Sequence, residues 1–98
     1  HAELLRLKER VSHMLVRTKN IYRAEDEEAA RDCIHEALEI GKLCDKRTIE
    51  MVNWTEGDGT AAATALCYRY FKRVVSHSMN IMTSIVMPFD KTDFFDEK

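Results

Sequence analysis

The chain has 98 residues, a formal net charge of −2 at pH 7, 45% hydrophobic residues and 33% charged residues. This is the size of one small domain, and the balance is typical of a packed globular protein rather than a disordered chain. The small net charge gives no overall attraction to nucleic acid or to an anionic membrane, so we expect neither partner. Because no apolar stretch approaches the length of a bilayer span, we expect no membrane insertion, and no signal peptide is evident at the start.

The first predicted helix runs over about residues 2–23. Its apolar positions recur at alternating steps of three and four, which places them on one helical face: Leu4, Leu7, Val11, Met14, Thr18 and Ile21. We expect Leu5, Leu15 and Tyr22 to widen this buried stripe. A short acidic link, residues 24–26, follows.

The second predicted helix runs over about residues 26–54, and the acidic residues at its start suit the positive end of the helix dipole. Its buried seam is predicted to contain Ala30, Ile34, Ala37, Gly41, Cys44, Thr48 and Met51. Small residues dominate the middle of the seam. We expect Ala37 and Gly41 to let another helix approach closely, because Gly41 otherwise destabilises a helix interior by about 1 kcal/mol relative to Ala.

Residues 55–59, Thr-Glu-Gly-Asp-Gly, form the clearest break in the chain. The third predicted helix runs over about residues 60–87, with Thr60 as its cap, and ends before Pro88. Its predicted seam is Cys67, Phe71, Val74, Ser78, Ile81 and Ile85, flanked by Leu66, Tyr70, Val75 and Met82. We expect the tail, residues 88–98, to fold back on the bundle or on a partner.

Long helices joined by short links predict an all-α fold, an antiparallel up-down-up three-helix bundle that forms a single domain over residues 1–98. Cys33, Cys44 and Cys67 include no CxxC pair, and their number and spacing suit neither a disulfide framework nor a zinc site. We expect three small buried side chains in a reducing cytosol, with a reactive thiol as the alternative.

Two acid–histidine pairs lie one helical turn apart, Asp32 with His35 and Glu9 with His13. A di-iron site in a helical bundle needs further inward-facing carboxylates on other helices, and the predicted seams contain none. We therefore interpret both pairs as solvated charged side chains and expect no metal ion there.

Residues 69–81 resemble the third-helix signature of the PhoU-type phosphate-uptake regulators, which reads approximately R-Y-L-E-R-I-G-D-H-x-x-N-I. The matching residues are Arg69, Tyr70, Arg73, His77, Asn80 and Ile81, with Phe71 and Val74 as apolar equivalents. The resemblance extends more loosely over residues 4–87, where the first two helices are only compatible with the family. It implies a PhoU-like bundle.

The chain departs from this family at two positions. Members typically carry a Glu and an Asp one turn apart that bind metal clusters, whereas this sequence has Lys72 and Ser76. A lysine is a cation and a serine is a poor ligand for hard metals, so we expect no bound metal and no cofactor. With Val74 facing the core, both side chains are predicted to point almost directly away from the bundle.

A polar flank accompanies the third helix: Arg69, Arg73, His77, Asn80 and Ser84. One interpretation is that Asn80 and His77 satisfy buried polar partners between helices. The other is that Arg73 and its neighbours contact a partner protein.

The resemblance implies a cytoplasmic accessory regulator of phosphate uptake and phosphate-starvation signalling. Such proteins act through contacts with the phosphate-transporter ATPase or the sensor kinase rather than as enzymes. Full-length members hold two three-helix repeats and this chain holds one, so we expect a homodimer, with the small-residue face of the second helix as a candidate surface.

Two alternatives remain open. One is a non-signalling oligomerisation or regulatory module of a larger transporter protein. The other is a small helical enzyme of the chorismate-mutase type, in which basic side chains converge on a dicarboxylate. Arg10, Arg17, Lys42 and Arg47 supply that residue type, although the pattern of that family is not matched.

Overall fold

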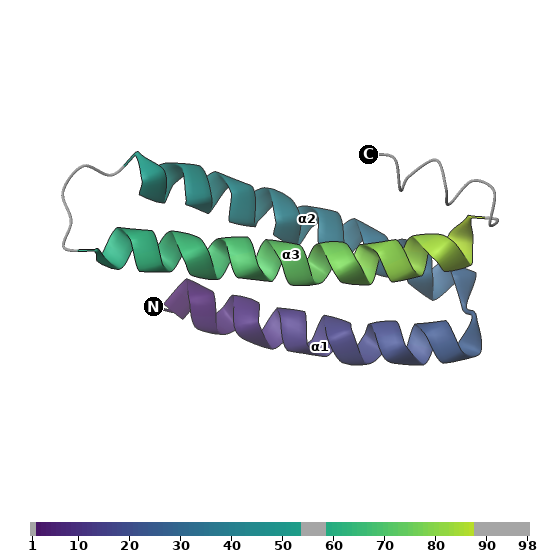
Figure 1. Cartoon of the computed structure of the whole chain (residues 1–98). Coiled ribbons are helices and arrows are strands. Elements are labelled where there is room, and N and C mark those ends of the chain that lie inside the picture. Colours follow the sequence, from purple (N-terminus) through teal and green to yellow (C-terminus); the bar gives the residue numbers. More distant parts are fainter. Residues whose placement is uncertain (1, 54–58, 88–98) are drawn as a thin grey trace.

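The computed structural model describes residues 2–53 and 59–87, which form three α-helices and no strand. These are α1 (Ala2–Ala24), α2 (Glu27–Val52) and α3 (Thr60–Val86) (Figure 1). The prediction of an all-helical chain with three helices is confirmed for this part of the protein. The predicted break at residues 55–58 and the tail at residues 88–98 lie outside the described residues. None of the helices formed by the described residues has the length and apolarity that a membrane span requires.

The helix ends follow from local chemistry. The Asp26 carboxylate accepts a hydrogen bond from the Ala29 backbone N–H at 3.1 Å, which satisfies one of the free donors at the start of α2. The residue that caps α3 is Gly59, with a φ of 97°, rather than the predicted Thr60. Such a positive φ is readily adopted by glycine. At the far end of α3, Met87 takes an extended conformation, as expected for the residue before a proline.

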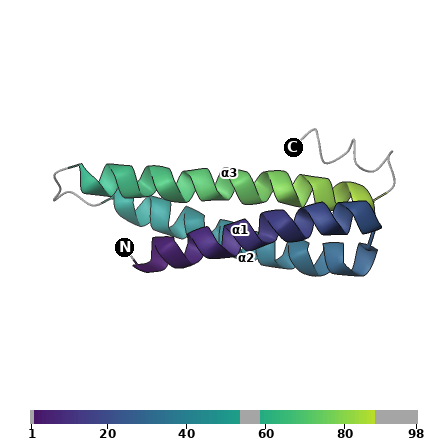
Figure 2. The same ribbon diagram turned by 90° about the horizontal axis from the view of Figure 1, so that it is seen from below.

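Contacts between distant residues define how the helices lie together. Glu3 pairs with Arg47 and Arg17 pairs with Glu36, so residue numbers rise along α1 as they fall along α2. The Thr18 hydroxyl lies 3.9 Å from the Met82 sulfur, which places the second half of α1 beside the second half of α3. Figure 2 shows the three helices lying lengthwise beside one another, with α1 crossing α2 at an angle.

The buried face of α1 and the seam of α2 are close to those predicted. Every predicted position of these two faces is buried or half-buried. The expectation that Leu5, Leu15 and Tyr22 widen the α1 stripe is wrong, because these side chains are 61%, 47% and 59% exposed. The part of α1 that α2 and α3 cover is therefore a narrow stripe.

The buried face of α3 differs from the predicted seam. Its buried residues are Ala65, Tyr68, Val75, Ser78 and Met82. Of the predicted seam only Ser78 is buried; Phe71, Val74 and Ile85 are half-buried, and Cys67 and Ile81 are exposed. The helix carries two neighbouring apolar stripes, and the one with Tyr68 faces the core. The other stripe faces α1 at the surface.

The small residues of α2 lie against α3 within the same chain. Ala37 and Gly41 are buried, and a Cβ built on Gly41 would lie 3.7 Å from the side-chain carbons Cδ and Cε of Lys72. The close approach of another helix is thus explained by α3 of the same chain, whereas the pairing of two copies through this face stays a prediction. Because 3.7 Å is an ordinary van der Waals distance, no steric clash requires a glycine at this position.

The cysteines do not share one environment. Cys33 and Cys44 are buried, as predicted, whereas Cys67 is exposed, which corrects the expectation of three buried thiols. Burial raises the pKa of the Cys33 thiol and raises that of Cys44 to about 11. These two thiols are therefore held in the neutral form at physiological pH.

Candidate functional site

The polar flank predicted on α3 lies at the surface. Arg69, Arg73, His77, Asn80 and Ser84 are all exposed. The Ser84 hydroxyl donates to the Ile81 carbonyl of its own helix at 2.6 Å. The interpretation of His77 and Asn80 as buried polar groups between helices is therefore wrong. Their exposure leaves them available to another molecule.

Lys72 and Ser76 occupy the boundary between α2 and α3. Both are half-buried, and the Lys72 ammonium pairs with the Asp45 carboxylate of α2 at 2.6 Å. The prediction that they point almost directly away from the bundle is wrong, because it took Val74 as the centre of the buried face. Val75 is the buried residue, and this rotation turns Lys72 and Ser76 towards α2.

A groove runs along the surface between α1 and α3. One stretch of it is lined by Tyr22 and Thr18 of α1 and by His77, Asn80 and Ile81 of α3. An adjoining stretch is lined by Val11 and Ser12 of α1 and by Leu66, Cys67, Tyr70, Phe71 and Val74 of α3. Leu15 lines both stretches, so they form one continuous surface feature, named here the α1–α3 groove.

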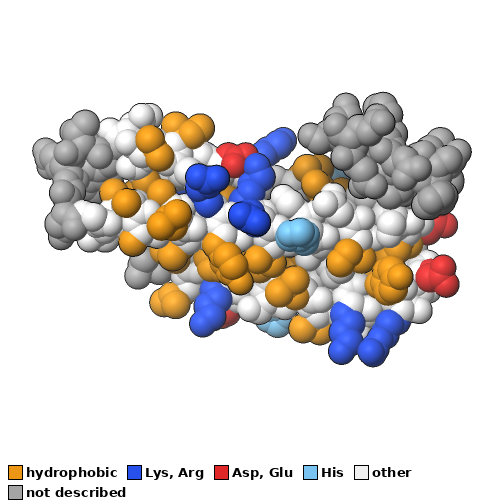
Figure 3. All heavy atoms as spheres, viewed as in Figure 1, with side chains coloured by type: hydrophobic (Ala, Val, Ile, Leu, Met, Phe, Trp, Pro, Cys, Tyr) orange, Lys and Arg blue, Asp and Glu red, His pale blue; other side chains and the backbone are white. Residues whose placement is uncertain are grey.

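The α1–α3 groove exposes large apolar side chains. Those with the most exposed surface are Leu66 at 65%, Tyr70 at 64%, Tyr22 at 59%, Leu15 at 47% and Ile81 at 42%. Figure 3 shows hydrophobic side chains gathered along the face where α3 lies beside α1, with Lys and Arg side chains beyond this band. A contiguous apolar surface of this kind is typical of an interaction site, whereas scattered single residues are not.

The charged residues of the groove are cations. Lys8, Lys19 and Arg23 of α1 contribute to its lining, while no Asp or Glu does among the described residues. These three cations form no ion pair with any residue in the ranges 2–53 and 59–87. Arg69 and Arg73 are exposed on the neighbouring surface of α3. The groove therefore combines an apolar floor with positively charged edges.

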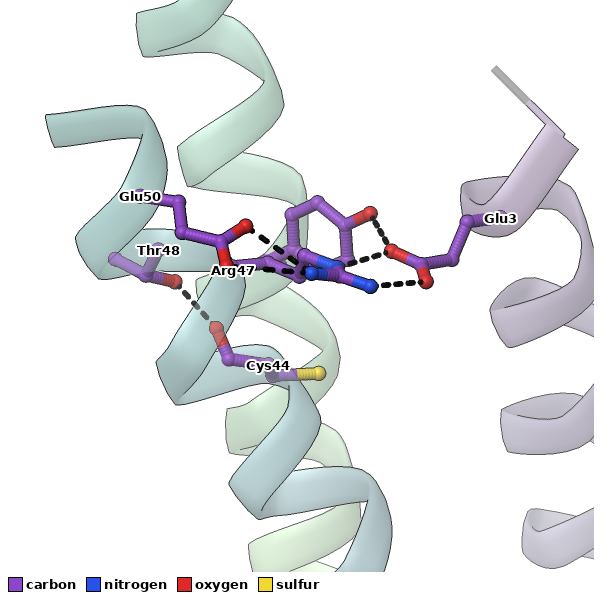
Figure 4. Close-up of polar contacts among 6 residues, drawn as sticks. Glu3, Cys44, Arg47, Thr48 and Glu50 are labelled. Carbon is purple, nitrogen blue, oxygen red and sulfur yellow. Dashed lines mark hydrogen bonds and ion pairs between the residues drawn. The ribbon is translucent and has the colours of Figure 1, made fainter. Parts of the chain in front are cut away.

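A polar cluster joins all three helices near the start of α1 (Figure 4). The Arg47 guanidinium donates from Nε and NH2 to the two carboxylate oxygens of Glu3, at 2.8 and 3.1 Å. Arg47 also pairs with Glu50 at 3.1 Å. The hydroxyl of the buried Tyr68 donates to Glu3. The bidentate contact between Arg47 and Glu3 is the geometry in which arginine and carboxylate bind most strongly.

The protonation states of this cluster are fixed by its hydrogen bonds. The bonds from Arg47 and Tyr68 lower the pKa of Glu3 from 4.5 to about 2, so this carboxylate is ionised at neutral pH. The pKa of Arg47 is raised by its bonds to Glu3 and Glu50. Burial, together with the bond to Glu3, raises the pKa of Tyr68 to about 12. The arrangement suits a structural tie between helices rather than proton transfer, which needs a pKa near the operating pH.

Sequence reasoning missed this cluster. Tyr68 was not on the predicted seam, and nothing in the local pattern relates Glu3 to Arg47, which lies 44 positions away. The one available signal is a tyrosine on the second apolar stripe of α3, because a buried tyrosine usually requires a hydrogen-bond partner for its hydroxyl.

The basic residues considered for a chorismate-mutase site are largely paired with acids of this chain. Arg10 and Arg17 both reach Glu36, at 3.5 and 2.7 Å, and Arg47 is bound by Glu3 and Glu50. Lys42 is exposed on α2. Three of the four side chains are thus already paired with carboxylates of this chain, and Arg10 and Arg17 share one of them.

The acid–histidine pairs lie at the surface. Asp32, His35, Glu9 and His13 are exposed. Within the described parts of the chain, no three His, Cys, Asp or Glu side chains are grouped so that they could share a metal ion. Among those residues, no third His, Cys, Asp or Glu side chain lies close enough to either pair to complete a metal site.

Comparison with known proteins adds no relative: no protein-family model, no curated protein and no solved structure matches this chain.

Proposed function

We propose that the protein is a regulator that acts by binding another protein in the α1–α3 groove of an antiparallel, PhoU-like bundle. The observation that carries this proposal is the exposure of Leu66, Tyr70 and Leu15 side by side between two helices. Burial of such side chains is the main favourable term in protein association, and aromatic residues are enriched at the centres of interfaces. An amphipathic helix or an extended segment of a partner would fit a groove of this kind.

The resemblance of residues 69–81 to the PhoU-type regulators supports a partner in phosphate uptake. By that resemblance the partner is the phosphate-transporter ATPase or the phosphate-responsive sensor kinase, and binding takes place in the cytoplasm. His77 and Asn80, which belong to the resembling segment, line the groove, and Arg73 is exposed on the same helix. The part of the chain that resembles the family therefore lies beside the surface proposed to bind.

The test is a binding measurement with the purified transporter ATPase and, in parallel, the sensor kinase. The double variant Leu66→Ser, Tyr70→Ser removes two exposed apolar side chains of the groove, and we expect it to weaken binding by about tenfold or more. Ile49→Ser is the matched control, because Ile49 is 61% exposed on α2 and does not line the groove. Its affinity should stay within about twofold of the original protein. Equal losses for both variants, or failure of the original protein to bind either candidate, would contradict the proposal.

A second candidate is supported by the same exposed groove, namely an oligomerisation or regulatory module of a larger transporter protein. Because Ala37 and Gly41 of α2 are buried against α3, we expect a second copy of this chain to use the groove instead. Light scattering over a micromolar concentration range separates the two. A homodimer that Leu66→Ser, Tyr70→Ser dissociates supports oligomerisation through the groove, whereas a monomer that binds the ATPase or the kinase supports the regulator.

A further inference from the structure

Among the described residues, nothing covers the α1–α3 groove, although its floor is apolar. Leu66 and Tyr70 are each almost two-thirds exposed, and Cys67 between them is exposed as well. A contiguous apolar surface left open to water is unfavourable, and proteins usually cover it with another segment or with a partner.

The residues that follow α3 have the complementary composition. Residues 88–98 read Pro-Phe-Asp-Lys-Thr-Asp-Phe-Phe-Asp-Glu-Lys, which places three phenylalanines among four acids and two lysines and gives a net charge of −2. The groove offers the opposite charge, since Lys8, Lys19 and Arg23 contribute to its lining and no described acid does. The phenylalanines and the net negative charge of the segment therefore find matching chemistry on this surface.

The attachment point and the length of the segment also fit. The contact of Thr18 with Met82 places the end of α3, from which the segment leaves at Met87, beside the stretch of the groove lined by Tyr22 and Arg23. At about 1.5 Å per helical residue, Leu66 lies about 31 Å back along α3 from Met87. Residues 88–98 span up to about 36 Å when extended, so they can follow the groove over its full length.

We propose that residues 88–98 dock in the α1–α3 groove of their own chain, with their phenylalanines on the apolar floor and their acids towards the cationic edges. This inference goes beyond the proposed function, because it concerns what covers the groove when no partner is bound. Any partner that uses the groove then has to displace this segment, which makes the segment a competitor built into the chain.

The exposed thiol of Cys67 provides the test, because it lines the groove while Cys33 and Cys44 are buried. The rate at which iodoacetamide labels Cys67 is measured in the whole protein and in the variant Phe89→Ser, Phe94→Ser, Phe95→Ser. If the segment covers the groove about nine-tenths of the time, its release raises the labelling rate about tenfold. The matched variant with leucine at the same three positions retains apolar side chains and should label within about twofold of the original protein.

Three results would overturn the inference. The first is an equal labelling rate in the original protein and the serine variant. The second is protection of Cys67 that increases with protein concentration, which would assign the cover to a second copy of the chain. The third is an unchanged rate in Lys19→Glu, Arg23→Glu, for which we expect an increase of about threefold because the cationic edge is reversed. Lys42→Glu, Lys46→Glu, which alters exposed cations of α2 instead, is the charge control. Unlabelled Cys33 and Cys44 verify in every variant that the bundle stays folded.

Discussion

Helix α3 packs differently against its two neighbours, closely against α2 and with an exposed groove against α1. Towards α2, the small residues Ala37 and Gly41 let α3 approach, and Lys72 closes the contact with its methylenes and its ion pair to Asp45. Towards α1, large side chains such as Leu15 and Tyr70 remain exposed along the groove. The small facing side chains thus let α2 and α3 pack closely, whereas α1 and α3 leave an apolar groove beside their buried contacts.

The largest expected loss of stability comes from a substitution in the buried face of α2. Ile40 of α2 is fully buried, so Ile40→Ala removes apolar contacts and leaves a cavity. We expect a loss of about 2–5 kcal/mol in the free energy of unfolding, measured by urea denaturation. Ile49→Ala on the same helix is the control, because its side chain is 61% exposed, and it should change stability by less than about 0.5 kcal/mol. Similar losses for both variants would show that α2 does not bury the face described here.

The second effect concerns the Glu3–Arg47–Tyr68 cluster, which ties the start of α1 to both other helices. Glu3→Gln keeps the shape of the side chain but removes its charge, and we expect a loss of about 1–2 kcal/mol at pH 7. The folded-state pKa of Glu3 is lowered from 4.5 to about 2, so its contribution is present above pH 4.5 and is lost as the pH falls towards 2.

Denaturation curves recorded between pH 7 and pH 2 check this assignment. The difference in stability between the original protein and Glu3→Gln should shrink as the pH falls through this window. Glu9→Gln, an exposed acid on the same helix, is the control and should change stability little. A difference that is constant with pH would contradict the account of the cluster.

A third and smaller effect has the opposite sign. Gly41→Ala adds a Cβ at an ordinary contact distance of 3.7 Å from Lys72, so the new methyl group fits. Alanine also favours the helix over the unfolded chain, and we expect a gain of about 0.5–1 kcal/mol by thermal or urea denaturation. Destabilisation by more than about 1 kcal/mol would mean that α3 lies closer to α2 than described.

The smallest effect on folding is expected in the groove. Leu15 is 47% exposed, so Leu15→Ser should lower the stability of the bundle by less than about 1 kcal/mol, while it weakens binding of whatever occupies the groove. Parallel measurement of unfolding and of Cys67 labelling separates these two effects. A loss of stability comparable to that of Ile40→Ala would place Leu15 in the core and contradict the open boundary.

The sequence was sufficient to predict the helices and two of the three buried faces. Along α1 and α2 the apolar residues follow one helical stripe, so periodicity identifies the core directly. Along α3 there are two apolar stripes, one containing Val74 and one containing Val75, and periodicity alone does not decide which is buried. The choice depends on tertiary contacts, above all the bond of Tyr68 to Glu3, which lies on another helix.

The same ambiguity explains the errors at the candidate site. A helix with Val74 at the core position has Lys72 and Ser76 at the surface and Cys67 in the interior, whereas the observed helix buries Val75. The placement of α3 over the small residues of α2 was likewise not predictable, because a stripe of small residues fits a helix of its own chain as well as one from another. The predicted polar residues between Arg69 and Ser84 are exposed, and three of them, His77, Asn80 and Ser84, line the groove, which periodicity does not reveal.

The most direct test of the contrast between a closed and an open boundary uses the three native cysteines together. Mass spectrometry of the folded variant Phe89→Ser, Phe94→Ser, Phe95→Ser reports which thiols react with iodoacetamide, and how fast. The account predicts rapid labelling of Cys67 and labelling of Cys33 and Cys44 only when the protein unfolds. Labelling of Cys44 as fast as that of Cys67 in the folded protein would contradict it, because the boundary described as closed would then be open.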